Sequence, residues 1–133
     1  MHLLESALYV DRLDRARDFY LPLLGARVLF EDHRLCALSV ADRQVLLLFR
    51  LGASTAPTET PGGTIPPHDG RGTQHLAFAV TPEELVVCRR RLDSLGIAIE
   101  STVHPPRGGT SVYFRDPDGH LVELATPGLW EIW

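Results

Sequence analysis

Apolar and polar side chains alternate along two distant stretches of the chain, residues 5–10 and 75–80, and the two stretches resemble one another. Alternation with a period of two is typical of a strand with one buried face. An amphipathic helical pattern follows each stretch and ends at a Leu-Gly pair, at 24–25 and at 95–96. Each copy then closes on an apolar strand. A repeat of this length predicts two similar units.

Each copy is predicted to have the element order β-α-β-β-β. The first helix must break or kink at Pro22, before Gly25. The second helix begins with a capping box formed by Thr81 and Glu84, and Gly96 stops it. The predicted strands are 5–10, 27–30, 35–40 and 43–49 in the first copy, and 75–80, 97–102, 110–115 and 120–125 in the second.

A chain of 133 residues is long enough for one domain with a buried core, and too short for two independent ones. Within this domain the repeat predicts four parts. They are module one at 1–51, a connecting loop at 52–74, module two at 75–126 and a C-terminal tail at 127–133.

The connecting loop is rich in Gly, Pro and Thr, and Ile65 is its one large apolar residue. The sequence therefore predicts a segment without regular structure, which serves either as a mobile linker or as a lid. The stiff segment 66–68, Pro-Pro-His, brings the imidazole of His68 just ahead of His75 and favours the lid.

The net charge of −4 argues against a nucleic-acid partner, because no basic excess exists to neutralise phosphates. No apolar run approaches the roughly 18 residues of a membrane span, and no signal peptide precedes the first strand. Cys36 and Cys88 lack CxxC spacing, so we expect two buried thiols and a reducing compartment. Together these features predict a cytoplasmic protein without nucleic-acid or membrane partners.

Strand parity places Glu5, His75 and Glu123 on the strand faces that do not pack under the helices. Leu47 occupies the fourth equivalent position. A strand histidine is more often a hydrogen-bonded core residue than a ligand, but two carboxylates on an apolar-lined face are costly unless a partner balances their charge. A divalent cation bound by Glu5, His75 and Glu123 would do so.

Other side chains are candidates for substrate binding. Tyr9 and Phe49 share the face of Glu5 and are predicted to form the pocket wall beside Leu47, and His68 is predicted to approach the same site. Arg107 lies in a Gly-rich turn, from which it either clamps an anionic substrate or remains solvated.

Residues 8–11 and 19–25 resemble the opening module of the vicinal oxygen chelate superfamily, and residues 75–80, 113–119 and 123–124 resemble its second module. This superfamily contains glyoxalase I, bleomycin- and fosfomycin-resistance proteins, extradiol dioxygenases and methylmalonyl-CoA epimerase. The resemblance implies an α+β fold in which two β-α-β-β-β modules pair into an open, curved mixed sheet. Its concave face would hold the metal.

The resemblance also implies the chemistry. The family's metal ligands map onto Glu5, Leu47, His75 and Glu123, and Leu47 cannot ligate. Three protein ligands remain for Mn, Ni, Zn, Mg or Fe, with open positions for a small substrate that has two adjacent oxygens. The metal would be a Lewis acid in lyase or isomerase chemistry, and Glu123 or Glu5 would be the general base.

Two alternatives remain open. The first is an extradiol-type dioxygenase, which uses two histidines and one carboxylate around ferrous iron, although Glu5 stands where the first histidine would be. The second is a metal-free protein that binds a drug or metabolite. Many relatives are dimers, and the tail carries Trp130 and Trp133, which we expect to pack on the sheet edge or across a dimer contact. We therefore predict a homodimer.

Overall fold

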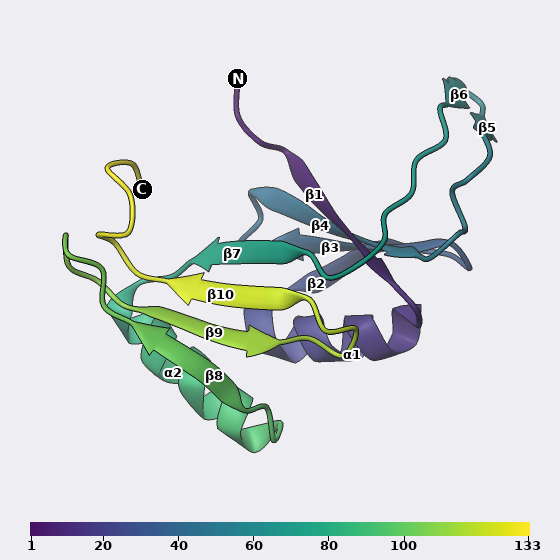
Figure 1. Ribbon diagram of the computed structural model, residues 1–133. Coiled ribbons are helices and arrows are strands. Elements are labelled where there is room, and N and C mark those ends of the chain that lie inside the picture. The colour runs from purple at the N-terminus through teal and green to yellow at the C-terminus, as the bar shows by residue number, and fades with distance from the viewer. The chain divides into compact units, whose positions relative to one another are not determined.

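The computed structural model describes all 133 residues, which form two compact units, residues 1–72 and 73–133. Each unit contains one helix and a four-stranded mixed sheet (Figure 1). The α+β class and the β-α-β-β-β order of both units, which the sequence predicts, are confirmed. The first unit also includes residues 52–72, most of the predicted connecting loop.

The sheet of the first unit has the strand order β1-β4-β3-β2. β1 and β4 are parallel, whereas the other two neighbouring pairs are antiparallel. Helix α1 packs against β3 and β4. The elements are β1 (Glu5–Val10), α1 (Leu13–Leu24), β2 (Arg27–Glu31), β3 (Leu35–Val40) and β4 (Gln44–Arg50).

The second unit repeats this arrangement, with the strand order β7-β10-β9-β8 and one parallel pair, β7 with β10. β9 is antiparallel to both of its neighbours. The elements are β7 (His75–Ala79), α2 (Pro82–Ser94), β8 (Ile99–Val103), β9 (Ser111–Arg115) and β10 (Leu121–Ala125).

The registers of the two sheets are equivalent at the four positions that the repeat aligns. In the first unit, Leu47 on β4 pairs with the residue two positions after Glu5 on β1. In the second unit, Glu123 on β10 pairs with the residue two positions after His75 on β7. Glu5 therefore corresponds to His75, and Leu47 to Glu123, as the repeat predicts.

The faces that parity assigns to the helices are buried, although on β10 Glu123 and Ala125 of the other face are buried too. In the first unit Leu8, Val10, Leu46 and Leu48 are at most 2% exposed, and these are the residues that strand parity assigns to the helix side. In the second unit the corresponding face of β9 and β10 is also closed to solvent. Val112, Phe114, Val122 and Leu124 are fully buried there. The opposite faces of the sheets are therefore the ones that remain available for a site.

The segment predicted to lack regular structure contains a small antiparallel hairpin, so this prediction is wrong. The hairpin consists of β5 (Thr58–Thr60) and β6 (Gly63–Ile65), and it extends away from the β1–β4 sheet (Figure 1). The Thr60 hydroxyl donates to the Gly63 carbonyl at 2.6 Å and closes the turn. The amide of His68, after the hairpin, donates to the carbonyl of Ser54, before it, at 2.9 Å. This hydrogen bond joins the two ends of the segment.

The sequence makes one prediction about the last turn of α1 and another about the first turn of α2. α1 is one continuous helix through Pro22, so of the predicted break or kink the break is absent. The proline removes only one amide, and near the helix end the amides of Gly25 and Ala26 both donate to the Leu21 carbonyl. In α2 the predicted capping box is present. The Glu84 amide donates to Thr81 Oγ1 at 3.1 Å, and the Thr81 amide donates to the Glu84 carboxylate at 2.7 Å.

The tail differs from its prediction of packing on a sheet edge. Trp130 and Trp133 are 71% and 62% exposed, and Ile132 is 82% exposed. Neither helix of the protein has the length and apolar character that a membrane span requires.

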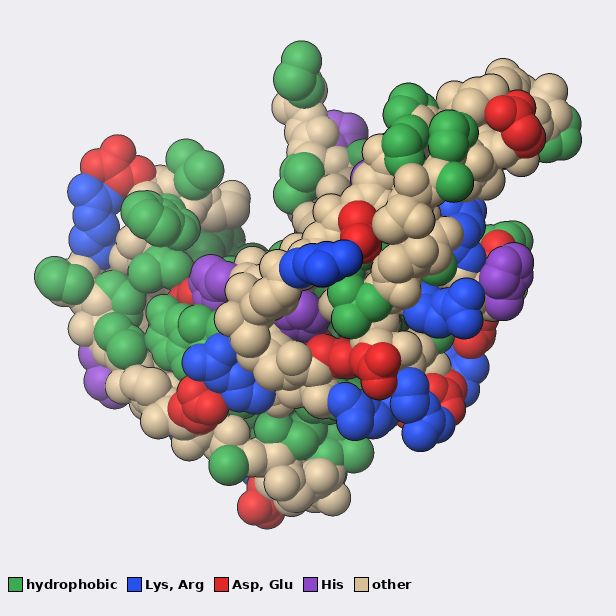
Figure 2. Space-filling view, turned by 45° about the vertical axis from the view of Figure 1, so that its right-hand side comes forward, with side chains coloured by type: hydrophobic (Ala, Val, Ile, Leu, Met, Phe, Trp, Pro, Cys, Tyr) green, Lys and Arg blue, Asp and Glu red, His purple; other side chains and the backbone are tan.

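Charge is distributed in small groups. On the face that Figure 2 shows, acidic and basic side chains are interspersed, and no broad basic area is visible. The ion pairs Arg12–Asp14, Arg27–Asp42 and Arg115–Glu100 are exposed pairs of this kind. Such exposed pairs add little stability.

Both cysteines are buried and free, as predicted. Burial raises the pKa of the Cys36 thiol to about 11. At pH 8 only about one thiol in a thousand is then ionised, and the thiolate is the reactive form. We expect neither Cys36 nor Cys88 to react with a disulfide reagent within minutes in native buffer, and both to react in guanidinium. Reaction of two thiols per chain within minutes in native buffer would contradict this burial.

Candidate functional site

The second unit brings His75 and Glu123 together. His75 is the first residue of β7, and Glu123 lies at the centre of the neighbouring strand β10. The Nε2 atom of His75 is 3.3 Å from Oε2 of Glu123. The two side chains differ in burial, since the imidazole is half exposed and the carboxylate is only 5% exposed. A buried carboxylate is thus directed at an accessible imidazole.

The other ring nitrogen of His75 defines its tautomer. Nδ1 lies 3.1 Å from the backbone carbonyl oxygen of Leu121, and a carbonyl can only accept a hydrogen bond. Nδ1 is therefore the donor, and in the neutral imidazole Nε2 carries a lone pair. This lone pair and the Glu123 oxygen face one another as two acceptors, so a proton or a cation must lie between them.

Tyr113 positions the carboxylate from the opposite side. It is the cross-strand partner of Glu123 in the β9–β10 pair, and its hydroxyl donates to Oε1 of Glu123 at 2.9 Å. Its ring also stacks on that of His75, with centroids 6.4 Å apart and planes 30° apart. Burial, together with the hydrogen bond to Glu123, raises the pKa of Tyr113. The phenol therefore stays protonated at neutral pH and holds one carboxylate oxygen, which leaves the other for His75.

The turn between β9 and β10 fixes the strands that carry this group. Asp116 Oδ1 accepts the amides of Asp118 and His120, at 3.0 and 2.8 Å. The Nδ1 atom of His120 accepts the amide of Gln74, the residue before β7, at 3.0 Å. His120 is 2% exposed. It is therefore a structural residue that links the start of β7 to the start of β10.

The pair of His75 and Glu123 fits a divalent ion. Ligand bonds from imidazole nitrogen and carboxylate oxygen are about 2.1 Å long, so two such atoms on one ion can be 3.3 Å apart. A ligating histidine also characteristically donates its other ring N–H to a carbonyl or carboxylate, as Nδ1 of His75 does. Neither unit by itself gathers three or more side chains of His, Cys, Asp or Glu.

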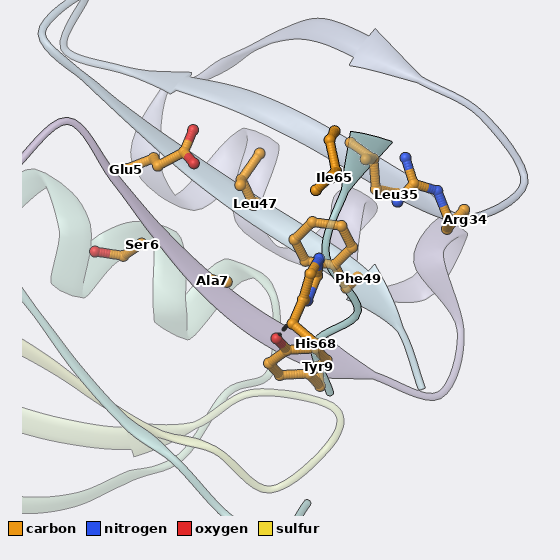
Figure 3. A pocket seen from close by; sticks show the side chains of 10 residues that line it. All are labelled: Glu5, Ser6, Ala7, Tyr9, Arg34, Leu35, Leu47, Phe49, Ile65 and His68. Carbon is orange, nitrogen blue, oxygen red and sulfur yellow. Dashed lines mark hydrogen bonds between the residues drawn. The ribbon is translucent and has the colours of Figure 1, made fainter. Parts of the chain in front are cut away.

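The first unit contains a pocket of about 470 Å³ on the sheet face opposite α1 (Figure 3). Most of its wall is apolar or aromatic, and its charged groups are few. Glu5 and Arg34 lie towards opposite ends, with Leu47 and Phe49 between them (Figure 3). The pocket is lined by Glu5, Ser6, Ala7, Tyr9, Arg34, Leu35, Leu47, Phe49, Ile65 and His68. Its size suits a small organic molecule.

Three rings form one wall of this pocket. Phe49 and the imidazole of His68 meet edge to face, with centroids 4.5 Å apart, and Phe49 stacks on Tyr9 at 5.8 Å. A hydrogen bond of 2.8 Å joins the Tyr9 hydroxyl to Nδ1 of His68. Gly70 allows this approach, because a Cβ atom there would lie 2.3 Å from the Tyr9 ring. The segment after β6 thus closes on β1 and contributes His68 to the pocket.

The structure places four of the five predicted substrate-binding residues in one pocket and the fifth elsewhere. Tyr9, Leu47, Phe49 and His68 all line the pocket of the first unit. Arg107 does not line it, and its guanidinium pairs with Glu131 at 2.6 Å. The roles of all five in binding stay predictions.

Of the three predicted metal ligands, two lie in the second unit and one in the first. His75 and Glu123 meet in the second unit, while Glu5 lies in the first, at one end of its pocket. Sequence reasoning missed two polar residues, Tyr113 and Arg34. The cross-strand position of Tyr113 opposite Glu123 was a usable signal in the sequence, whereas Arg34 lies in a turn and has no strand parity.

Comparisons with known proteins agree with the resemblance seen in the sequence. The profile of the Glyoxalase/Bleomycin resistance protein/Dioxygenase superfamily matches residues 2–124. Biphenyl-2,3-diol 1,2-dioxygenase 2 of Rhodococcus globerulus is 35% identical over 120 residues, which are 88% of this chain and 58% of that protein. The chain thus spans less than two thirds of the length of this relative.

Solved structures match over a larger share of their own length. A lactoylglutathione lyase from Agrobacterium tumefaciens is 32% identical with a TM-score of 0.86, and the match covers 98% of this chain and 96% of that one. The fosfomycin resistance protein FosX of Listeria monocytogenes is 23% identical with a TM-score of 0.71, over 97% and 95% of the two chains. This second likeness concerns the fold alone.

Proposed function

Because this chain belongs to the Glyoxalase/Bleomycin resistance protein/Dioxygenase superfamily, we propose that it is a metal-dependent enzyme acting on a small substrate with two adjacent oxygens. The proposed reaction is of the lyase or isomerase type. The observation that carries the proposal is the 3.3 Å approach of His75 Nε2 and Glu123 Oε2, two acceptors that a bound cation would bridge where a proton does not. The lyase among the solved structures, which matches nearly the whole chain, supports this reaction class.

The proposed ligands are His75, Glu123 and Glu5, and the proposed ion is Mn, Ni, Zn, Mg or Fe. Support for Glu5 comes from the equivalent registers of the two sheets, since Glu5 occupies in its copy the position of His75. Leu47, at the fourth position, has no ligand atom and leaves room for substrate oxygens. The ion, when bound, supplies Lewis acidity that polarises a substrate carbonyl.

The two glutamates are proposed to have different roles. The Glu123 carboxylate is buried, and the Tyr113 hydroxyl holds one of its oxygens, which suits a fixed ligand. Glu5 is exposed, and no other side chain of the first unit bonds to its carboxylate. That freedom suits a general base that takes a proton from the carbon beside the substrate carbonyl. Tyr9, Leu47, Phe49 and His68 would form the wall on which the rest of the substrate lies.

A second candidate function is an extradiol-type dioxygenase. The 35% identity to a biphenyl-2,3-diol dioxygenase over 88% of this chain favours it. The glutamate at position 5 argues against it, because these enzymes bind ferrous iron with two histidines and one carboxylate. A third candidate, a metal-free protein that sequesters a drug or metabolite, uses the same pocket without an ion.

Two assays on one preparation separate the candidates. Metal-free protein is supplied with each ion in turn and assayed for isomerisation of the adduct of a 2-oxoaldehyde and a thiol, and for oxygen uptake with catechols. We expect isomerisation, and a loss of about 100-fold or more in kcat in Glu5→Gln, as for removal of a general base. Oxygen uptake under ferrous iron would favour the dioxygenase. Absence of both activities, with no ion bound, would favour the binding protein.

Assembly and location are also proposals. We propose a cytoplasmic homodimer whose contacts involve the apolar tail. The exposure of Trp130, Ile132 and Trp133 in the single chain supports this, since monomers rarely leave clustered apolar side chains open to water.

A further inference from the structure

Arg34 differs from the arginines that are ion-paired on the surface. Arg17, Arg27 and Arg107 each contact a carboxylate, whereas the guanidinium of Arg34 has no carboxylate within ion-pairing distance. Its only polar contacts are two long ones from Nη1, each 3.4 Å, to the hydroxyls of Ser54 and Thr58. Its Nε and Nη2 donors make no polar contact within the protein, and the side chain lines the pocket.

The turn that carries Arg34 is fixed by its own hydrogen bonds. Asp32 Oδ1 accepts the amides of Arg34 and Leu35, both at 2.8 Å, and the Arg34 carbonyl accepts the Arg50 amide at 2.8 Å. Burial opposes ionisation of Asp32, but the two amides and the nearby positive charge outweigh it and lower the pKa of this carboxyl. Asp32 is therefore committed to the backbone, and it positions Arg34 without neutralising it at contact distance.

The surroundings of the guanidinium are those of a recognition site for an anion. Its Cζ atom lies 5.9 Å from the centroid of the Phe49 ring, within the range of a cation–π contact. Leu35 and Ile65 lie beside it in the pocket wall, on the side towards Leu47 (Figure 3). In such apolar surroundings a charge-assisted hydrogen bond is stronger than in water. Glu5, the one carboxylate of the lining, lies towards the other end of the pocket.

We infer that Arg34 selects ligands that carry a carboxylate on an aromatic or apolar body. The carboxylate lies against the guanidinium, and the body lies on the rings of Tyr9, Phe49 and His68. Both hydroxyls contact Nη1, so Nε and Nη2 remain for a ligand. A singly charged carboxylate suits them, because its two oxygens match the planar fork of arginine. This inference rests on the proposed function for one point only, that the reacting oxygens of the substrate lie at the Glu5 end.

The experiment uses 4-phenylbutyrate and its neutral analogue 4-phenylbutanamide as probes, with binding to the ¹⁵N-labelled chain followed by NMR in the presence of a chelator. We expect the acid to shift the amide signals of Arg34 and His68 and to bind roughly 10- to 100-fold more tightly than the amide. In Arg34→Gln we expect this preference to disappear. Arg34→Lys, which keeps the charge but loses the fork, should retain part of it.

Arg43→Gln is the matched control, because it removes the same charge from an exposed arginine that does not line the pocket. It should bind both probes as the wild type does. Equal affinity of the wild type for acid and amide, an unchanged preference in Arg34→Gln, or no binding of the acid at millimolar concentration would each overturn the inference. The chelator separates this result from the proposed function, whose failure appears as a lack of ion binding with the acid preference intact.

Discussion

We expect a divalent ion at a hundredfold excess over its Kd to raise the melting temperature of the wild-type protein by roughly 10 °C, and that of His75→Ala by little or nothing. The expected stabilisation is RT ln(1 + [L]/Kd), about 2.7 kcal/mol, which corresponds to that shift for a chain of this size. The reason is local: the ion would form bonds to two ligand atoms that already lie 3.3 Å apart. Thermal melts with Mn, Ni, Zn and Mg measure this shift.

Two further variants sharpen the result. Glu123→Gln keeps the volume of the side chain and an acceptor for the Tyr113 hydroxyl but removes the charge, so it should lose most of the shift as well. Glu83→Gln removes an exposed charge at the start of α2 in the same unit and should keep the full shift. A shift of equal size in His75→Ala and in the wild type would show that the ion binds elsewhere.

The second large effect concerns the core beneath the site. We expect Phe114→Ala to lower the free energy of unfolding by about 3–5 kcal/mol. Phe114 is fully buried on β9, next to Tyr113, whose side chain lies on the opposite face of the strand. Its cross-strand partner is Val122, which is also fully buried. The truncation leaves a cavity under the strands that carry Tyr113 and Glu123. Urea denaturation measures the loss.

Val103→Ala provides the comparison for this variant. Val103 ends the neighbouring strand β8 and is 44% exposed, so its truncation should change the free energy of unfolding by less than about 1 kcal/mol. If Phe114→Ala were no more destabilising than Val103→Ala, the core assigned to the second sheet would be wrong.

Much of the fold follows from the sequence because strand parity and a repeat constrain each other. The alternation of apolar residues assigns Leu8 and Val10 to one face of β1 and Glu5 to the other, and the burial of these residues agrees. The same parity on two adjacent strands brings His75 and Glu123 within 3.3 Å. The alternation of apolar side chains is a local property of the sequence, and packing buries the same face that the alternation marks. The face read from the sequence is therefore the face that the structure buries.

The errors lie where local signals are weak. The β5–β6 hairpin has no apolar alternation, and it forms through backbone pairing and the polar contacts of Thr60 and Thr64. Pro22 suggested a break, but a proline near the end of a helix removes only one hydrogen bond. The orientation of the Arg34 side chain depends on the turn that Asp32 stabilises and on Thr58 of the hairpin. Neither feature produces a periodic pattern in the sequence.

Calorimetric titration of metal-free protein with Mn²⁺ and Zn²⁺ tests the central claim, that His75 and Glu123 hold a divalent ion. We predict one ion per chain for the wild type, with micromolar or tighter affinity, and binding weakened by about 100-fold or more in Glu123→Gln, since a ligand is lost outright. Equal affinity in the wild type and in Glu123→Gln, or no binding of any divalent ion by the wild type, would contradict the claim.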